Sequence, residues 1–195
     1  MTATMTKPNR SRSVGGLRTN SGRAGANRVR EQLSYSIGIC ALGTLLVAST
    51  AKGIIAILIG GNPEMLKLDL QARFPEVVLV EGNAAHLALT VRVARFVEAP
   101  QTGLDLPLDM RGTAFQEQVW RALQGIPAGA TASYTEIAAT IDAPNAVRAV
   151  ASACTANPLA VAIPCHRVLR RDGTPAGYRW GIERKRDLLA REARA

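Results

Sequence analysis

The chain begins with a polar stretch and changes to short apolar runs from Tyr35 onward. Three runs of β-prone residues follow one another, separated by Ala-Leu-Gly and Ala-Lys-Gly, which are compatible with tight turns. These runs are Tyr35–Cys40, Gly43–Ser49 and Gly53–Ile59. Short turns join antiparallel neighbours, so the pattern predicts a three-stranded meander.

Helical spacing of apolar residues follows the third run. Asn62 and Pro63 are typical of a helix start, and this first helix is expected to end before Pro75. A second helix is expected over about residues 83–97, and an extended connector with one more strand over residues 103–110. The apolar positions expected to face the core from the second helix are Leu87, Val91, Ala94 and Phe96.

The second half of the chain is mainly helical in pattern. Thr113 and Ser133 each precede a helical stretch and are followed three residues later by Gln or Glu, which is the spacing of a capping box. A further helix is expected to carry Pro144 in its first turn and to end at about Ala156. Together with a helix over residues 134–141 it looks like a helix-turn-helix, a pair that all-α proteins also use without binding DNA.

The second helix of that pair has one face of small residues with a single long cation. Val147, Val150, Ala151 and Cys154 recur at helical spacing and are expected in the core. The opposite face carries Asn145, Arg148, Ala149, Ser152 and Ala156. Side chains that read a major groove are usually longer and polar, so this face better suits a minor groove or a gap in a base stack.

Composition excludes several classes of protein. With 47% hydrophobic residues the 195-residue chain is too apolar to be disordered throughout, and no apolar run approaches the roughly 20 residues that span a bilayer. Three dispersed cysteines cannot build a disulfide scaffold, which favours a reduced intracellular compartment.

The net charge of +9 is unevenly placed. Residues 1–30 hold seven basic and no acidic residues, and residues 111–195 hold 12 basic and 7 acidic ones, so both regions suit a polyanion. Because the first 33 residues are polar and basic, we expect a flexible leader there, a composition that a transit peptide also shows.

A thiol stands beside an imidazole and a guanidinium in the run Cys165-His166-Arg167. Such neighbours favour a nucleophilic thiolate. Adjacent side chains of a strand point to opposite faces, so a bend at Pro164 or a bridging water must connect thiol and imidazole. The alternative is a buried cysteine with a structural histidine. A zinc site has little support, because the remaining cysteines and histidine show no ligand spacing; these are Cys40, Cys154 and His86.

Glu192 falls inside the apolar stripe of the last helical stretch, between Leu188 and Leu189. A carboxylate there is costly unless it is paired. It either orients an imidazole, as in nucleophile–base–acid triads, or pairs with Lys185 on the same side.

Several of these blocks together resemble the O6-alkylguanine-DNA alkyltransferases. The resemblance runs from about Tyr35 to Glu192, and the Pro-Cys-His-Arg-Val block in this setting is highly specific. The matching blocks are Arg111–Gln116 followed by Val119-Trp120, Arg148–Cys154, Asn157-Pro158, Pro164–Val168 and Gly177–Gly181.

The resemblance implies an α+β fold in two parts. A small ribonuclease-H-like three-stranded sheet with helices (residues 34–107) would support a mainly helical, winged-helix-like helix-turn-helix domain that binds DNA and accepts the alkyl group (residues 108–195). Residues 1–33 would be the basic leader.

The implied function is direct reversal of DNA damage, in which the alkyl group on O6 of guanine, or O4 of thymine, moves to a cysteine that is used once. Cys165 would be the acceptor, His166 the base acting through a water, and Glu192 the group that orients His166. Asn157 would hold the turn beside the site, and Tyr134 would help flip the nucleotide and donate a proton to the departing guanine.

The resemblance also implies the surfaces that meet DNA and the base. Arg148 would enter the stack in place of the flipped nucleotide, on a face shared with Ala149 and Ser152. The pocket would be walled by Tyr178, Arg179, Val168 and Trp180, with the carbonyls of Cys165 and Val168 accepting from the guanine amino group.

The implied partner is double-stranded DNA carrying O6-alkylguanine, met by a monomer in the cytoplasm at the nucleoid, with no cofactor, metal, membrane or obligate protein partner. Departures from the family pattern are Asn145, where Lys or Arg often stands, and Ala130, where a polar residue is common. The leader lacks a zinc-binding cysteine cluster, so transcriptional control is not implied. A non-catalytic damage sensor or a helix-turn-helix regulator is the alternative, and a cysteine hydrolase would lack an evident oxyanion arrangement.

Overall fold

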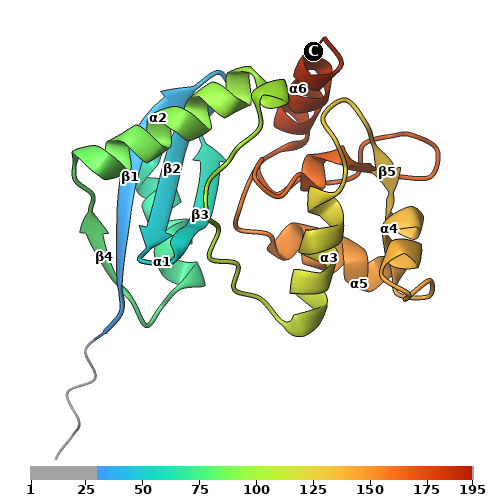
Figure 1. Cartoon of the computed structure of the whole chain (residues 1–195), viewed down its shortest axis with the longest axis horizontal. Coiled ribbons are helices and arrows are strands. Elements are labelled where there is room, and N and C mark those ends of the chain that lie inside the picture. The colour runs from blue at the N-terminus through green and yellow to red at the C-terminus, as the bar shows by residue number, and fades with distance from the viewer. Residues whose placement is uncertain (1–29, 195) are drawn as a thin grey trace, which may run out of the picture.

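The computed structural model describes residues 30–194, which form a four-stranded sheet beside a helical half (Figure 1). The strand order is β3-β2-β1-β4. The strands are β1 (Gln32–Cys40), β2 (Gly43–Thr50), β3 (Gly53–Gly60) and β4 (Val78–Glu81). The antiparallel meander of β1, β2 and β3 is confirmed. The sheet has four strands rather than the expected three, because β4 pairs in parallel with the edge of β1. β4 is short and largely exposed, so it lacks the alternation of buried and exposed residues that marks a strand in a sequence.

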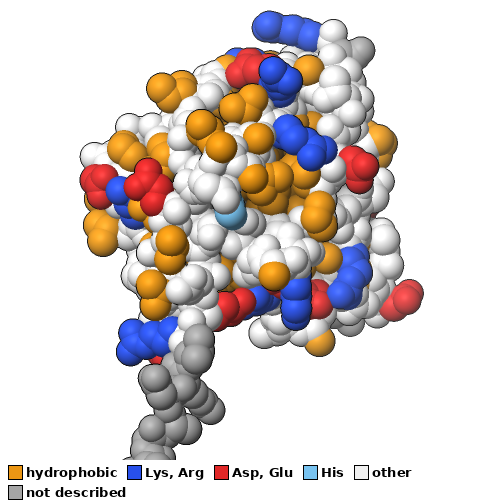
Figure 2. All heavy atoms as spheres, turned by 60° about the vertical axis from the view of Figure 1, so that its left-hand side comes forward, with side chains coloured by type: hydrophobic (Ala, Val, Ile, Leu, Met, Phe, Trp, Pro, Cys, Tyr) orange, Lys and Arg blue, Asp and Glu red, His pale blue; other side chains and the backbone are white. Residues whose placement is uncertain are grey.

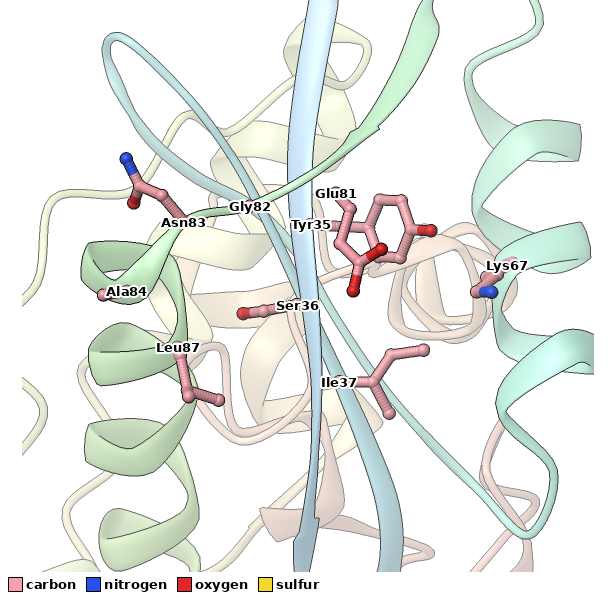
Figure 3. Close-up of a pocket in the computed structure, with 9 residues that line it drawn as sticks. All are labelled: Tyr35, Ser36, Ile37, Lys67, Glu81, Gly82, Asn83, Ala84 and Leu87. Atoms are coloured by element: carbon pink, nitrogen blue, oxygen red, sulfur yellow. The ribbon is translucent and has the colours of Figure 1, made fainter.

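Helices α1 (Pro63–Arg73) and α2 (Ala84–Glu98) cover opposite faces of this sheet (Figures 1 and 3). The start of α1 is confirmed, since the Asn62 side chain accepts hydrogen bonds from the first turn. The core face of α2 was predicted only in part: Phe96 is buried as expected, whereas Leu87 is 51% exposed. Thr90, which was not among the expected positions, is buried. Thr90 tolerates burial because Ser36 of β1 lies within hydrogen-bond distance of its hydroxyl, with 2.5 Å between the two oxygens.

The side of the molecule that carries β4 and the start of α2 is partly apolar. Figure 2 shows apolar side chains gathered over this face with charged side chains around them. The large apolar side chains exposed on these elements and on β1 are Ile39, Val78, Val80, Leu87 and Val91.

The connector between the halves contains a short 3-10 helix, η1 (Pro100–Thr102). The strand expected over residues 103–110 is reduced to a single parallel bridge between Ile54 and Leu108. The Ile54 backbone both donates to and accepts from this connector, over 2.8 Å each way, so the connector runs beside the start of the edge strand β3.

The helical half contains four α-helices, a 3-10 helix and a two-stranded parallel pair. These are α3 (Ala114–Gln124), β5 (Ala132–Ser133), α4 (Tyr134–Thr140), α5 (Val147–Ala156), η2 (Cys165–Arg167), β6 (Val168–Leu169) and α6 (Ile182–Glu192). Both predicted capping boxes are present, at Thr113 and Ser133. Pro144 lies in the turn before α5 rather than in its first turn, because the helix begins only at Val147.

The two halves are joined along the free edge of β3. The Ile57 backbone donates to the Pro158 carbonyl over 2.9 Å and accepts from Ala160 over 3.0 Å. The segment that follows α5 therefore extends the sheet by one bridge and is held at the place where the chain turns toward Cys165.

Residues 1–29 and 195 lie outside the described part, so the predicted leader is largely untested; β1 already begins at Gln32. Within residues 30–194, every helix is too short or too polar to cross a membrane.

Trp120 connects α3 to α5 in the core of the helical half. It is 1% exposed, and its indole nitrogen donates to the Ala153 carbonyl over 2.9 Å. Gly112 lies against the ring so closely that a Cβ there would be 2.8 Å from a ring carbon.

We predict that Trp120→Phe lowers the free energy of unfolding by about 1–3 kcal/mol, because the buried Ala153 carbonyl loses its donor. Urea unfolding at pH 7 measures this. The control Ile39→Ala, at a side chain that is 84% exposed, should change the free energy by less than about 0.5 kcal/mol. Equal effects of the two substitutions would contradict the assigned role of Trp120.

Candidate active site

Asn157 organises the turn between α5 and the Cys165 segment. Its side chain is fully buried, and its amide nitrogen donates to the Ile163 carbonyl over 2.9 Å and to the Cys165 Sγ over 3.4 Å. Its amide oxygen accepts from the Leu159 backbone over 2.9 Å. Val161 in the same turn has a φ of 60°, a strained conformation for a β-branched residue. One buried amide thus ties both sides of the turn to the sulfur.

Cys165 and His166 lie in the 3-10 helix η2, so the chain departs here from strand geometry, as the first of the two alternatives, a bend at Pro164, expects. Pro164 immediately precedes this helix. Cys165 is 4% exposed and His166 1%. The opposite-face geometry of a strand therefore does not apply to this pair.

Glu192, from the end of α6, reaches His166 and Arg167. Its Oε1 accepts from His166 Nε2 and from Arg167 Nη2, each over 2.8 Å, and its Oε2 accepts from Arg167 Nε over 2.9 Å. The alternative partner, Lys185, instead donates to the Val168 carbonyl over 2.5 Å. The sequence analysis named Arg167 only as a neighbour of the thiol, and its ion pair with Glu192 was not predicted.

The protonation states follow from this arrangement. Burial alone would raise the pKa of Glu192, but the hydrogen bonds and charges of His166 and Arg167 lower it to about 2. Burial lowers the pKa of His166, so its ring is neutral at pH 7. A carboxylate only accepts, so Nε2 carries the proton and Nδ1 is left as an acceptor. Nδ1 is buried and has no hydrogen-bond partner within residues 30–194.

The expected lowering of the thiol pKa is wrong for the structure as it stands. Burial raises the pKa of Cys165 to about 11, against the smaller opposing effects of Asn157 and Lys185. Burial likewise raises the pKa of Tyr134 to about 12. Cys165 is therefore a thiol at rest, and a base must take its proton as it reacts.

Cys165 borders a very small cavity that adjoins a larger one. The small cavity, about 10 Å³, is also lined by Tyr134, Cys154 and Tyr178. The larger one, about 470 Å³, shares Tyr134 and Tyr178 and extends to Ala151. The space at the sulfur holds about one water, while a wider space lies next to it.

The wall of the small cavity is anchored from the other half of the molecule. The Tyr178 and Trp180 rings meet edge to face with centroids 5.1 Å apart, and Trp180 is buried. Arg179 pairs with Asp69 of α1 over 2.5 Å. The neighbouring Arg73 donates to the Ala156 carbonyl at the end of α5 over 3.3 Å. No pattern in the sequence indicated these two α1 residues, because both contacts join distant parts of the chain.

The remaining predicted residues are placed as follows. Arg148, Ala149 and Ser152 lie exposed on α5, while Val150 and Cys154 on its other face are buried. Ala151, expected in the core, is half-buried.

Both carbonyls expected to face the guanine amino group already have partners in the protein. The Cys165 carbonyl accepts from the Val168 backbone, and the Val168 carbonyl accepts from Lys185. Each oxygen keeps a second lone pair.

A separate cavity of about 300 Å³ lies between β1, α1 and α2 (Figure 3). Tyr35 and Lys67 line it, the ammonium lying 5.8 Å from the ring centroid, and Ser36 points the other way, toward α2. None of its lining residues is a cysteine or a histidine. Across residues 30–194, no three His, Cys, Asp or Glu side chains are grouped to hold a metal ion.

Comparison with known proteins places these features in one family. A family model described as 6-O-methylguanine DNA methyltransferase, DNA binding domain, matches residues 114–194. The "Bifunctional transcriptional activator/DNA repair enzyme Ada" of Escherichia coli is 50% identical over 159 residues, which cover 82% of this chain and 45% of that protein. An inducible methylated-DNA–protein-cysteine methyltransferase of Bacillus subtilis is 41% identical over 150 residues, which cover 76% of this chain and 84% of that one.

Comparison with solved structures supports the same family. The crystal structure of Mycobacterium tuberculosis OGT in complex with DNA aligns with a TM-score of 0.71 and 34% identity, covering 83% of this chain and 93% of that one. The chain spans about half the length of the Ada protein and of the regulatory protein ada of Salmonella typhimurium, which it covers to 45% and 50%. The Bacillus protein, in contrast, is matched over most of its length, and this chain belongs to the family of methylated-DNA–protein-cysteine methyltransferases.

Proposed function

We propose that this protein repairs DNA by transferring the alkyl group from O6 of guanine in double-stranded DNA to Cys165, in a single irreversible turnover. The observation that carries the proposal is a buried cysteine, Cys165, which borders a cavity beside α5 and is followed in the sequence by His166, whose imidazole pairs with Glu192 over 2.8 Å. The names of the relatives support the same reaction, and the mycobacterial relative, whose structure was solved in complex with DNA, supports DNA as the partner. The transcriptional activity named for the Ada protein is not part of the proposal.

The proposed reaction begins with the proton of Cys165. His166 Nδ1, which is free to accept, takes it through one water, and Glu192 stabilises the resulting imidazolium. The sulfur then attacks the alkyl carbon in line; the S–C bond forms as the C–O6 bond breaks, and the electron pair goes to guanine. Tyr134, held neutral by its raised pKa, donates the proton that guanine takes up. The product is a thioether, so the acceptor is used once and the chemistry requires no cofactor or metal.

Access of the base requires the cavity at Cys165 to open. About 10 Å³ does not admit a purine, whereas the adjoining 470 Å³ does, so residues 176–180 must move as the base enters. Arg148, exposed on the smooth face of α5 with Ala149 and Ser152, would fill the gap left in the stack. Tyr178 and Trp180 would then flank the base.

The proposal also assigns different roles to the two halves of the chain. Residues 34–107 would support the site, through β3 and α1, and residues 108–195 would carry DNA binding and chemistry. We propose that the protein acts as a monomer and without an obligate protein partner. We also propose that it acts in the cytoplasm, at the nucleoid when it is bound to DNA.

Incubation with an oligonucleotide containing O6-methylguanine should add one methyl group to Cys165, measured by intact mass and peptide mapping. Cys165→Ala should gain none, while Cys40→Ala, which changes a thiol of β1, should react like the wild type. Lesion binding by an unmodified wild-type protein would favour the damage-sensor alternative.

Arg148→Ala should slow repair in duplex DNA by about ten- to a hundredfold, because filling the stack offsets a few kcal/mol of unstacking. Repair of the same lesion in a single strand should change little, since no stack has to be filled. Single-turnover kinetics on both substrates measure the difference. Arg186→Ala, which removes an exposed cation from α6, is the control. Equal losses on both substrates would contradict the base-replacing role.

Glu192→Gln should make the free energy of unfolding fall less steeply as the pH is lowered. The pKa of Glu192 is about 2 in the fold against an ordinary 4.5, so the ionised carboxylate stabilises the fold above pH 4.5 and this contribution is lost as pH falls toward 2. Urea unfolding between pH 2.5 and 7 should show a smaller decline for Glu192→Gln than for the wild type. The control Glu183→Gln, at an exposed acid of the same helix, should keep the wild-type slope. Parallel profiles for all three proteins would refute this assignment.

A further inference from the structure

A second thiol borders the same small cavity as the acceptor. Cys154, in the third turn of α5, is 7% exposed, and Cys165 is 4% exposed. Both are free cysteines and both line the space of about 10 Å³, which is close to the volume needed for one water. The two side chains therefore face a gap about one water molecule wide.

The proposed transfer chemistry leaves Cys154 unused. Burial first, and then the charge of Cys165, raises the pKa of Cys154 to about 12. This effect of Cys165 agrees with the closeness that the shared cavity shows. Cys40, the third cysteine, lies in β1 and borders neither of the two adjoining cavities.

We propose that Cys154 is a resolving thiol, which forms a reversible disulfide with Cys165 when a hydroperoxide oxidises the acceptor. The effect of this disulfide on repair rests on the proposed function of Cys165, whereas the formation of the disulfide does not.

The steps balance. The Cys165 sulfur takes one oxygen from the hydroperoxide, which leaves as an alcohol, or as water when hydrogen peroxide is the oxidant. The Cys154 thiol then attacks the resulting sulfenic acid; the S–S bond forms and the hydroxyl leaves with the thiol proton as water. A dithiol reductant returns both thiols.

The size of the cavity selects the oxidant. A space of about 10 Å³ admits a molecule near the size of water, such as hydrogen peroxide, and excludes a bulky disulfide such as oxidised glutathione. A disulfide places its Cβ atoms about 3.5–4.5 Å apart, so its formation requires the two cysteines to close the gap between them. Without a resolving thiol, further oxidation to a sulfinic acid removes the acceptor irreversibly.

The experiment treats the full chain with hydrogen peroxide, quenches it, and maps the peptides without reduction. Because no Lys or Arg lies between the two cysteines, trypsin leaves both in the peptide of residues 149–167. We expect this peptide to be lighter by two hydrogens than its reduced form, with Cys154 linked to Cys165. Dithiothreitol should then restore most of the repair of an O6-methylguanine oligonucleotide, relative to the untreated protein. In Cys154→Ala the same treatment should leave sulfinic or sulfonic Cys165, and dithiothreitol should restore at least fivefold less of that variant's own untreated activity.

The matched control is Cys40→Ala, which should form the link and recover as the wild type does. Equal recovery in the wild type and Cys154→Ala, whatever the extent of oxidation, would overturn the proposal, as would a disulfide that joins Cys40. A linked peptide in a protein that transfers no methyl group would refute the proposed repair function and leave the disulfide standing.

Discussion

The site depends on a carboxylate kept ionised inside the protein. Glu192 is 4% exposed, a position that a lone charge cannot hold, and it is stabilised there by Arg167 and by the imidazole of His166. Arg167 neutralises the charge and also donates to the Ile126 carbonyl, which ties the end of α6 to the loop after α3. Removing the carboxylate would leave a guanidinium buried without its counter-ion, so the ion pair is at once structural and chemical.

The sheet contributes to the site without supplying a reactive side chain. Its edge strand β3 holds the segment after α5 through the Ile57 backbone, directly beside Asn157. On the other side of the cavity, Asp69 of α1 holds Arg179 in the wall that covers the sulfur. Contacts with the first half of the chain thus hold both the turn that contains Asn157 and the cavity wall that contains Arg179. A half with few candidate catalytic residues therefore supports the site by positioning these two segments.

Local signals in the sequence predicted the local structure well. The meander followed from three β-prone runs with tight turns, and the capping boxes at Thr113 and Ser133 marked two helix starts correctly. Errors arose where tertiary packing decides. The core face of α2 includes Thr90 because a serine on β1 satisfies it, and β4 is a strand only because β1 offers it an edge.

At the candidate site, too, local signals were predictive and tertiary contacts were not. A carboxylate in an apolar stripe indicated that Glu192 has a buried partner, but spacing alone did not choose between His166 and Lys185. The protonation state of Cys165 at rest could not be predicted from the sequence either. The pKa of a thiol depends on how completely the fold buries it, and the types of the neighbouring residues do not reveal that burial. The contact between Arg179 and Asp69 joins residues 110 positions apart.

The near-closed cavity has a consequence for an acceptor that works only once. A solvent-exposed cysteine would react with any small electrophile that reached it, and each such reaction would inactivate one protein molecule without repairing a lesion. Here the sulfur is buried as an uncharged thiol, and the small cavity beside it admits only molecules near the size of water, hydrogen peroxide among them. In the proposed function, this restricted entry keeps larger electrophiles away from Cys165 until the damaged base is flipped out of the DNA.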